Sequence, residues 1–489
     1  MRKVIDLQME FWKKDIADIK FDFQSRDEIP KLLMGLQHIY STRKIRDKVF
    51  KILSSIVPRN KHGIGRPGMD LWKILVLGTL RLNCNCDVDK LHELANNHRT
   101  LRLMLGHDEA DTDSLYALQT IRDNISMLTP EMLDEINQIV VQTGHQLAMR
   151  KMDAALKGSC DSFVVETDVH HPTDSNLLYD AVRKMITGIA IICSEIGITQ
   201  WRQSHHIVLK VKRLLRTIQK LRRSTSKDKV KKAQREAVIV EAHENYIKVC
   251  TDLISRVEET IQILREMGLV SLMQDLSLTT VEGYICHAQR QIDQIRRRVV
   301  LDEKIPHSEK VFSIFEPHTE WISKGKAGVS QELGLRVCVL KDQNGFILHH
   351  RVMERQTDDK VAVAMIQETR ERFPNLTSCS FDKGFYTPAN KKELGAILDY
   401  TILPKKGRLS ARDKELEHSE EFITARHRHS AVESTINALE NHGLDRCRDH
   451  GLHGFKRYVA LAVIARNIQI IGHLIQQKEL RRQKRRRAA

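Results

Sequence analysis

Three acidic residues stand at positions from which their carboxylates could meet. Asp161 opens a stretch of β-branched and aromatic residues, Asp382 ends a second such stretch, and Glu433 lies near the start of a helical pattern. Phosphodiester cleavage with two metal ions needs carboxylates from separate elements, because the ions activate the attacking oxygen and stabilise the leaving oxygen. Carboxylate oxygens suit Mg²⁺, with Mn²⁺ as a substitute. These three acids are therefore candidates for a catalytic site that holds two Mg²⁺ ions, as are other trios among the acids of the chain.

The elements around the acids must support this choice, because the chain contains 63 Asp and Glu residues. Residues 161–169 lack helical periodicity and are closed by a His-Pro pair, which indicates a strand. Residues 335–340 and 346–352 are two further strands. Between them lies Asn344-Gly345, the favoured pair for a tight hairpin turn.

The pattern then alternates. A helix is predicted over 358–373, a strand over 378–382 and a strand over 400–403, with helices over 430–442 and 453–475. The order of strand, hairpin, helix, strand, helix, strand and helix matches a ribonuclease-H-like core. We therefore predict an α/β ribonuclease-H-like catalytic domain built from residues 155–175 and 301–475.

The remaining regions are predicted to be helical or unstructured. Residues 1–150 read as an all-helical DNA-binding region, and residues 176–300 as a helical insertion after the first strand. In the insertion, apolar residues at 207, 211, 214, 218 and 221 form a heptad seam. A second apolar series over 253–264 predicts an antiparallel coiled-coil hairpin, with a third helix over about 281–299. Residues 476–489 form a basic tail.

The charge of the chain indicates a polyanionic partner. The formal net charge is +16, and the run 202–235 contains a single acid. Lys and Arg side chains that neutralise phosphates release counterions, so nucleic acid is the leading candidate. The alternative for the run is the solvated face of a coiled coil. Nine scattered cysteines and the charged residues near the N-terminus favour a cytoplasmic, nucleoid-associated protein without a membrane-spanning segment.

Three blocks of sequence carry a family resemblance. Residues 161–175, 381–386 and 429–434, the last followed by 443–446, resemble in order the three catalytic blocks of insertion-sequence DDE transposases of the IS5-like group. Residues 324–335 and the segment Gly65-Arg66-Pro67 are also similar to that family. The resemblance extends over most of the chain except the helical insertion.

The resemblance implies that the catalytic acids are Asp161, Asp382 and Glu433. Asp168 is the main rival for the first position. Because residues seven apart in a strand point to opposite faces, only one of the two is expected to serve the site. Asp161 is preferred, since it heads the Asp-Ser start of its block.

Other positions are expected to contact DNA phosphates or to pair protomers. These residues are Lys326, Lys383, Arg426, His429, Lys212, Arg213, Arg216 and Arg222. The family often carries Tyr, Arg and Lys around the glutamate, and this chain has Arg426, His429 and Glu440 at those spacings. Glu440 cannot replace a lysine, so the contacts with DNA ends are expected to differ.

The resulting expectation is a transposase that nicks transposon ends and joins the freed 3′-hydroxyl to target DNA. Its partners would be double-stranded transposon ends and target DNA, and a homodimer on DNA is expected because two ends must meet. One alternative is a transposase-derived, repressor-like DNA-binding protein that does not cut. Another is a basic coiled-coil scaffold, which would leave the three blocks unexplained.

Overall fold

The computed structural model describes residues 15–57, 68–108, 111, 113–148, 154–223, 228–268, 270–323 and 331–488. The predictions made for Lys326 and for residues 65–67 lie outside this part of the chain. The chain divides into two compact units. The first consists of Met1–Asp168 with Glu320–Ala489, and the second is Val169–Thr319.

The first unit is built on a mixed sheet with strand β1 in the middle. The strand order is β2-β3-β1-β5-β6, while β4 pairs with β3 and β7 pairs with β1. β1 is antiparallel to β3 and parallel to β5 and β7. The strands are β1 (Leu156–Thr167), β2 (Glu320–Ser323), β3 (Gln331–Lys341), β4 (Ile347–Met353), β5 (Leu376–Phe381), β6 (Tyr400–Ile402) and β7 (Arg446–Cys447). The predicted mixed α/β architecture is confirmed.

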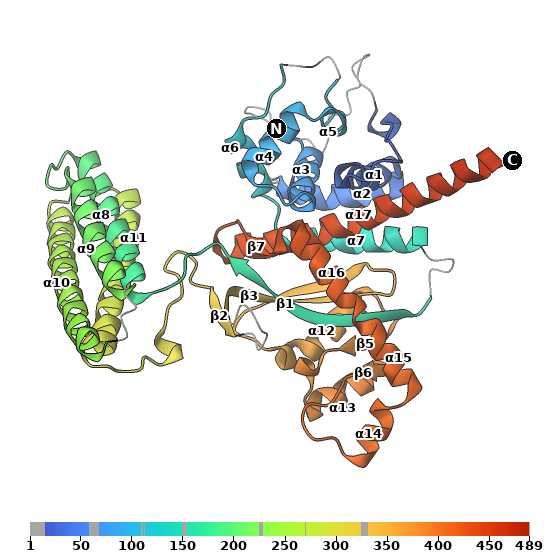
Figure 1. Cartoon of the computed structure of the whole chain (residues 1–489). Coiled ribbons are helices and arrows are strands. Elements are labelled where there is room, and N and C mark those ends of the chain that lie inside the picture. Colours follow the sequence, from blue (N-terminus) through green and yellow to red (C-terminus); the bar gives the residue numbers. More distant parts are fainter. Residues whose placement is uncertain are drawn as a thin grey trace. The chain divides into compact units, whose positions relative to one another are not determined.

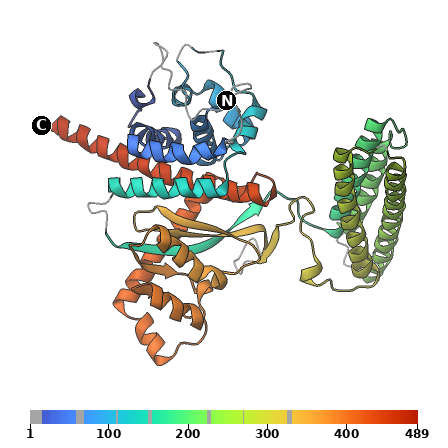
Figure 2. The same ribbon diagram turned by 180° about the vertical axis from the view of Figure 1, so that it is seen from behind.

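Helices cover both faces of this sheet (Figure 1). α7 (Pro130–Ala148) and α17 (Gly451–Ala488) lie on one face, and the N-terminal helices pack against them. α12 (Asp358–Arg372) lies on the other face, beside α13 (Pro388–Ile397), as the reverse view also shows (Figure 2). The remaining α-helices of this unit are α1 (Glu28–Ser41), α2 (Arg43–Leu53), α3 (Leu71–Asn83), α4 (Val88–Asn97), α5 (Arg99–Met104), α6 (Leu118–Ile125), α14 (Ala411–Glu417), α15 (Glu420–His429) and α16 (Ala431–Leu439). The helical N-terminal region is thus confirmed.

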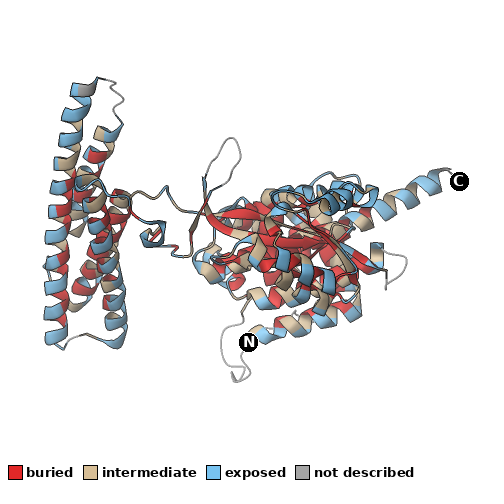
Figure 3. Cartoon of the chain, turned by 90° about the horizontal axis from the view of Figure 1, so that it is seen from below, coloured by how far each residue is buried: buried red, intermediate tan, exposed pale blue. Residues whose placement is uncertain are grey.

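α17 is the central helix of the first unit. One stretch of it is long and apolar enough to cross a membrane, but 72% of that stretch is buried inside the protein. This is the pattern of a core helix. The helix continues through residues 476–488, the predicted basic tail, and its end is exposed (Figure 3). Lys and Arg are good helix formers, so a helix already nucleated on the core extends into this segment.

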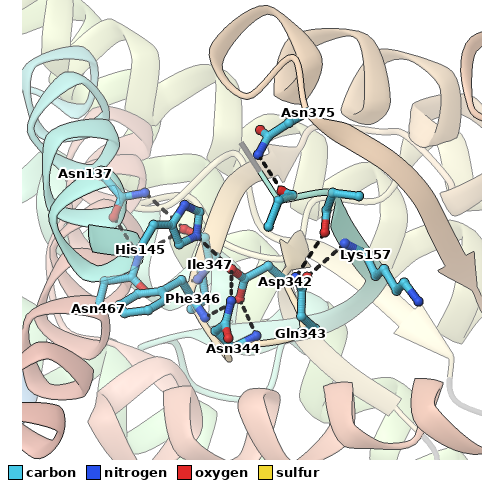
Figure 4. A network of polar contacts seen from close by, with 12 residues as sticks. Asn137, His145, Lys157, Asp342, Gln343, Asn344, Phe346, Ile347, Asn375 and Asn467 are labelled. Atoms are coloured by element: carbon cyan, nitrogen blue, oxygen red, sulfur yellow. Dashed lines mark hydrogen bonds and ion pairs between the residues drawn. The ribbon is translucent and has the colours of Figure 1, made fainter. Parts of the chain in front are cut away.

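The β3–β4 turn is fixed by buried polar contacts (Figure 4). The Asp342 carboxylate accepts hydrogen bonds from the N–H groups of Asn344 and Phe346, and it lies 2.7 Å from Nε2 of His145 on α7. Gly345 has a φ of +88°, which the Asn-Gly pair permits at low cost. Nearby, Asn467 on α17 bonds both the N–H and the carbonyl of Ile347 on β4. These contacts join α7, the hairpin and α17.

The second unit is helical. Its described residues contain α8 (Asp174–Ile196), α9 (Ser204–Arg222), α10 (Lys229–Glu266) and α11 (Leu272–Ile295). The predicted seam of α9 faces inward, where Val211 and Ile218 are buried. The predicted hairpin of α9 and α10 is therefore part of a four-helix arrangement. α8 was not predicted as a separate helix, although its buried residues, such as Leu178, Val182 and Met185, recur at the helical spacing of three to four positions.

Candidate active site

Parallel pairing of β1 with β5 brings two of the predicted acids together. Cys160 on β1 pairs with Phe381 on β5. Asp161 and Asp382 are the next residues on each chain segment. Adjacent strands lie about 4.8 Å apart, so the two acids start from neighbouring backbone positions. Asp382 is exposed where the chain leaves the sheet, while Asp161 is partly buried.

Glu433 reaches the same region from a helix. It lies in the first turn of α16, which packs against β1. The start of α16 is tied to the sheet, because Nζ of Lys341 at the end of β3 donates a 2.6 Å hydrogen bond to the carbonyl of Ala431. Glu433 is close enough to Asp161 for its negative charge to raise the pKa of that residue. Its side chain is exposed.

The acids influence one another electrostatically. Burial, with smaller contributions from the negative charges of Asp382, Asp358 and Glu433, raises the pKa of Asp161 from 3.8 to about 6. A 2.7 Å hydrogen bond from the Ser162 N–H to the Asp161 carboxylate opposes this shift. Two of these charges belong to the predicted trio. The third, Asp358, was not predicted.

The donor set fits a hard divalent cation, although it does not form a closed cage. Carboxylate oxygens are the ligands that Mg²⁺ and Mn²⁺ prefer, and a cation would offset the repulsion that raises the Asp161 pKa. Among the described residues, however, no three Asp, Glu, His or Cys side chains lie close enough together to hold one ion. The carboxylates would have to draw together around a metal.

His429 lies against the acids but is not a fixed cation. Its Nδ1 is 2.9 Å from the hydroxyl of Ser380, the penultimate residue of β5. Burial lowers its pKa, although the charges of Asp382 and Glu433 act in the opposite direction. Near neutral pH its ring is therefore mainly neutral and acts as a hydrogen-bond partner. Lys383 and Arg426 are exposed.

Asp168 lies away from Asp161. It follows the last residue of β1, and seven residues of extended chain span roughly 23 Å. Its carboxylate is 3.7 Å from Arg446, which also contacts Glu166 at 3.1 Å. Arg446 comes from β7, beside the end of β1. These positions favour an ion-pairing role for Asp168.

Asp358 is the acid that sequence reasoning missed. It lies in the first turn of α12, and its carboxylate accepts a 2.6 Å hydrogen bond from the hydroxyl of Ser162, next to Asp161. The available signal was the acid pair Asp358-Asp359 at the start of the predicted helix. Acids at a helix start are usually explained by the helix dipole, so this signal does not single out a site.

The basic run on the second unit is largely exposed. Arg213 and Arg216 on α9 are exposed, and Lys212 is half-buried. Arg222 is partly engaged within the unit, because its guanidinium lies 3.3 Å from Nε2 of His243. Burial lowers the pKa of Arg222, while the charge of Asp174 raises it. Arg222 is thus less available to an external phosphate than its neighbours.

Comparison with known families gives one match. The family model described as the Transposase DDE domain matches residues 296–468. The matched range contains Asp358, Asp382 and Glu433 but not Asp161. It supports a DDE transposase, a class of metal-dependent DNA-cleaving enzymes. No curated protein and no solved structure matches the chain.

Proposed function

We propose that this chain is a DNA transposase that nicks transposon ends and joins the freed 3′-hydroxyl to target DNA. The observation that carries the proposal is the parallel pairing of Cys160 with Phe381, which makes Asp161 and Asp382 neighbours on the sheet. Glu433 lies on α16, which packs against the same strand β1. The pKa of Asp161 is raised mainly by burial, and a buried carboxyl with a raised pKa among other acids is typical of functional sites. The match to the Transposase DDE domain supports the same reading. Membership of the IS5-like group rests on the three sequence blocks.

The sheet supports a ribonuclease-H-like catalytic core. The path β4-β3-β1-β5-β6 has antiparallel pairs on one side of β1 and parallel pairs on the other. This is the order that the predicted succession of strand, hairpin and alternating helices and strands would give. In such a core the acids come from the central strand, its parallel neighbour and a C-terminal helix. Asp161, Asp382 and Glu433 have these origins.

Asp161, Asp382 and Glu433 would hold Mg²⁺, with Mn²⁺ as a substitute. When bound, the ions activate the attacking oxygen and stabilise the leaving oxygen. The residues of the chain orient this chemistry. Asp161 is fixed by the Ser162 N–H, and Lys341 anchors the helix that carries Glu433.

DNA would lie against the exposed cations of both units. Near the acids, Lys383 and Arg426 are exposed, and His429 can offer a neutral ring. Lys326 belongs to the same proposal from sequence alone. On α9, Lys212, Arg213 and Arg216 are proposed to contact phosphates, with Arg222 contributing less. Joining two transposon ends to one target requires two active sites, so we propose a homodimer on DNA in the cytoplasm, associated with the nucleoid.

The test is nicking of a labelled duplex that carries candidate transposon ends, with Mg²⁺ and with chelator. We expect metal-dependent products with 3′-hydroxyl ends. Asp161→Asn, Asp382→Asn and Glu433→Gln should each lower the rate by about a hundredfold or more while binding to DNA is retained. Asp168→Asn is the matched control and should cut like the wild type.

Other outcomes would change the proposal in defined ways. Binding to the ends without cleavage, in Mg²⁺ and in Mn²⁺, would favour a transposase-derived, repressor-like protein. Cleavage that survives Asp161→Asn but not Asp168→Asn would keep the enzyme and replace its first acid.

A further inference from the structure

One carboxylate, that of Asp358, contacts both chain segments that carry the sheet acids. Its Oδ1 accepts the 2.6 Å hydrogen bond from the Ser162 hydroxyl, directly after Asp161. Its Oδ2 would lie 2.9 Å from a Cβ atom placed on Gly384, two residues after Asp382. Asp358 therefore lies between β1 and the turn that follows β5.

A larger residue at position 384 would be restricted by the space available, not by the backbone conformation. Gly384 does not have the positive φ that strains other residues, so its backbone alone would accept alanine. The atom that an added Cβ would meet belongs to the Asp358 side chain. The turn after Asp382 thus lies so close to the Asp358 carboxylate that a Cβ atom at position 384 would require this carboxylate to shift.

A second set of contacts holds the same elements together. Nδ2 of Asn390 on α13 donates hydrogen bonds to the carbonyls of Asp359, at 2.7 Å, and Phe385, at 2.9 Å. Asn390 is itself buried, and its N–H bonds the Thr387 hydroxyl at the start of α13. The first turn of α12 and the turn after Asp382 are therefore linked through backbone atoms as well.

We propose that Asp358 is a positioning residue, which sets the separation of the Asp161 and Asp382 carboxylates and thereby the affinity of the site for divalent metal. The proposal rests on the proposed function, because it concerns the same acids. Asp358 acts through Ser162 on one side and through its packing against Gly384 on the other. Asp358 itself is not proposed to bind the metal.

The competing explanation is that Asp358 only stabilises the start of α12. An acid in the first turn of a helix interacts favourably with the helix dipole. Asp359 occupies the same turn, but its carboxylate accepts a 2.6 Å hydrogen bond from the hydroxyl of Thr357, two residues before it. Asp359 is therefore the matched control, since it shares the helix position without the contacts to Ser162 and Gly384.

The experiment is a titration of the full chain with Mn²⁺ alone, followed by the electron paramagnetic resonance signal of free Mn²⁺. Asp358→Ala should weaken binding by about tenfold, the lower end of the effect of removing a group that orients a ligand. Asp358→Asn should weaken it by less than about threefold, because its amide oxygen still accepts the Ser162 hydroxyl. Asp359→Asn should bind like the wild type. Thermal unfolding of each variant checks that it is folded.

Two further variants leave every carboxylate in place. Ser162→Ala removes the hydrogen bond, and Gly384→Ala pushes on Asp358, so both should weaken Mn²⁺ binding. Adding Gly384→Ala to Asp358→Ala should cause no further loss, because the side chain that Cβ would meet is gone. If Asp358→Ala does not fold, Ser162→Ala and Gly384→Ala still test whether the contacts of Asp358 affect Mn²⁺ binding.

Several results would overturn the proposal. The first is Mn²⁺ binding by Asp358→Ala that equals wild-type binding. The second is wild-type binding by both Ser162→Ala and Gly384→Ala. The third is a loss of Mn²⁺ affinity in Asp359→Asn as large as that in Asp358→Ala. An Asp358→Asn loss equal to that of Asp358→Ala would show that the charge matters and not the contact. If the wild type binds Mn²⁺ and Asp161→Asn weakens it while Asp358→Ala does not, only this inference fails. If the wild type binds no Mn²⁺, the proposed function fails with it.

Discussion

At the scale of single residues, the Asp161 carboxyl is both partly buried and close to other negatively charged carboxylates. Either factor disfavours the ionised form, and together they raise its pKa to about 6. Near neutral pH the Asp161 carboxyl is nevertheless ionised in most molecules. The folded protein therefore holds a negative charge where burial and neighbouring carboxylates oppose it. Such an arrangement lowers stability and is typical of sites that are organised for binding or catalysis.

Replacing Asp161 should therefore stabilise the metal-free protein in a pH-dependent way. Its folded pKa lies above the unfolded value, so the stability contribution of the protonated form is present below about pH 4 and is lost as pH rises through about 6. Asp161→Asn should unfold like the wild type at about pH 4 and should gain roughly 1–3 kcal/mol at about pH 7.5, the upper figure applying if solvent screening is small. Urea unfolding with chelator at both pH values measures this.

The control is Asp168→Asn, which removes an exposed carboxylate just beyond the end of the strand that carries Asp161. Its effect should stay within about 0.5 kcal/mol at either pH, since exposed ion pairs contribute little. A gain of equal size in both variants, or at both pH values, would contradict the expectation for Asp161.

The trio of acids was predicted from sequence, whereas Asp358 was not. Asp382 directly follows β5, as the local pattern predicts, but Asp161 lies in the middle of β1 and does not open the strand, because the strand begins earlier, at Leu156. The contact of Asp358 with Ser162 joins residues 196 positions apart. Nothing in the local pattern distinguishes it from any other acid that begins a helix.

At the scale of elements, those whose structure is specified by neighbouring residues could be predicted from sequence, and those that depend on distant residues could not. The β3–β4 hairpin could be predicted because Asn344-Gly345 specifies a tight turn. β7 could not, since its two residues belong to the sheet only through the end of β1. α17 was predicted over 453–475, but its continuation depends on a helix already held by the core.

The crossing of α1 and α17 offers a test of packing between elements. A Cβ atom on Gly472 would collide with the carbonyl oxygen of Lys31, and one on Gly35 with the carbonyl oxygen of Ile468. Backbone atoms cannot move aside as side chains can. Gly472→Ala should therefore destabilise the protein by about 2–3 kcal/mol, as overpacking does in other cores.

Gly395 on α13 provides the control, because a Cβ atom there would meet nothing within 4 Å. Gly395→Ala should leave stability unchanged or raise it by up to about 1 kcal/mol, since alanine favours helix. Thermal and urea unfolding of both variants would compare them. Equal destabilisation would mean that the crossing is not close at Gly472.

At the scale of the whole molecule, charge is the dominant feature. The formal charge is +16, and α9 contains no Asp or Glu. Exposed Arg213 and Arg216 lie on this helix, while the end of α17 adds further exposed cations in the first unit. Both units therefore present basic surface that could follow a phosphate backbone.

The contribution of α9 can be measured by the salt dependence of DNA binding. Replacing both Arg213 and Arg216 by alanine should lower the slope of log K against log salt by about 2, because about one counterion is released per phosphate contact. Arg290→Ala is the control, since Arg290 is an exposed cation on α11. If the slope is the same for the wild type, the double variant and Arg290→Ala, DNA does not bind through Arg213 and Arg216.

The position of β1 in the chain has a consequence for synthesis. Glu166 pairs with Gly334 and Ser159 with Lys341, so the paired residues are separated by 334 − 166 = 168 to 341 − 159 = 182 positions, which must be made before β1 can pair with β3. At roughly 5–20 residues per second, this takes about 10–35 s. The helices of the second unit rely on nearer contacts and can fold first, while β1 waits with both edges unpaired and open to association with other chains. The three proposed catalytic acids can meet only after Glu433 has left the ribosome, so with the proposed activity a growing chain could not cut DNA before that point.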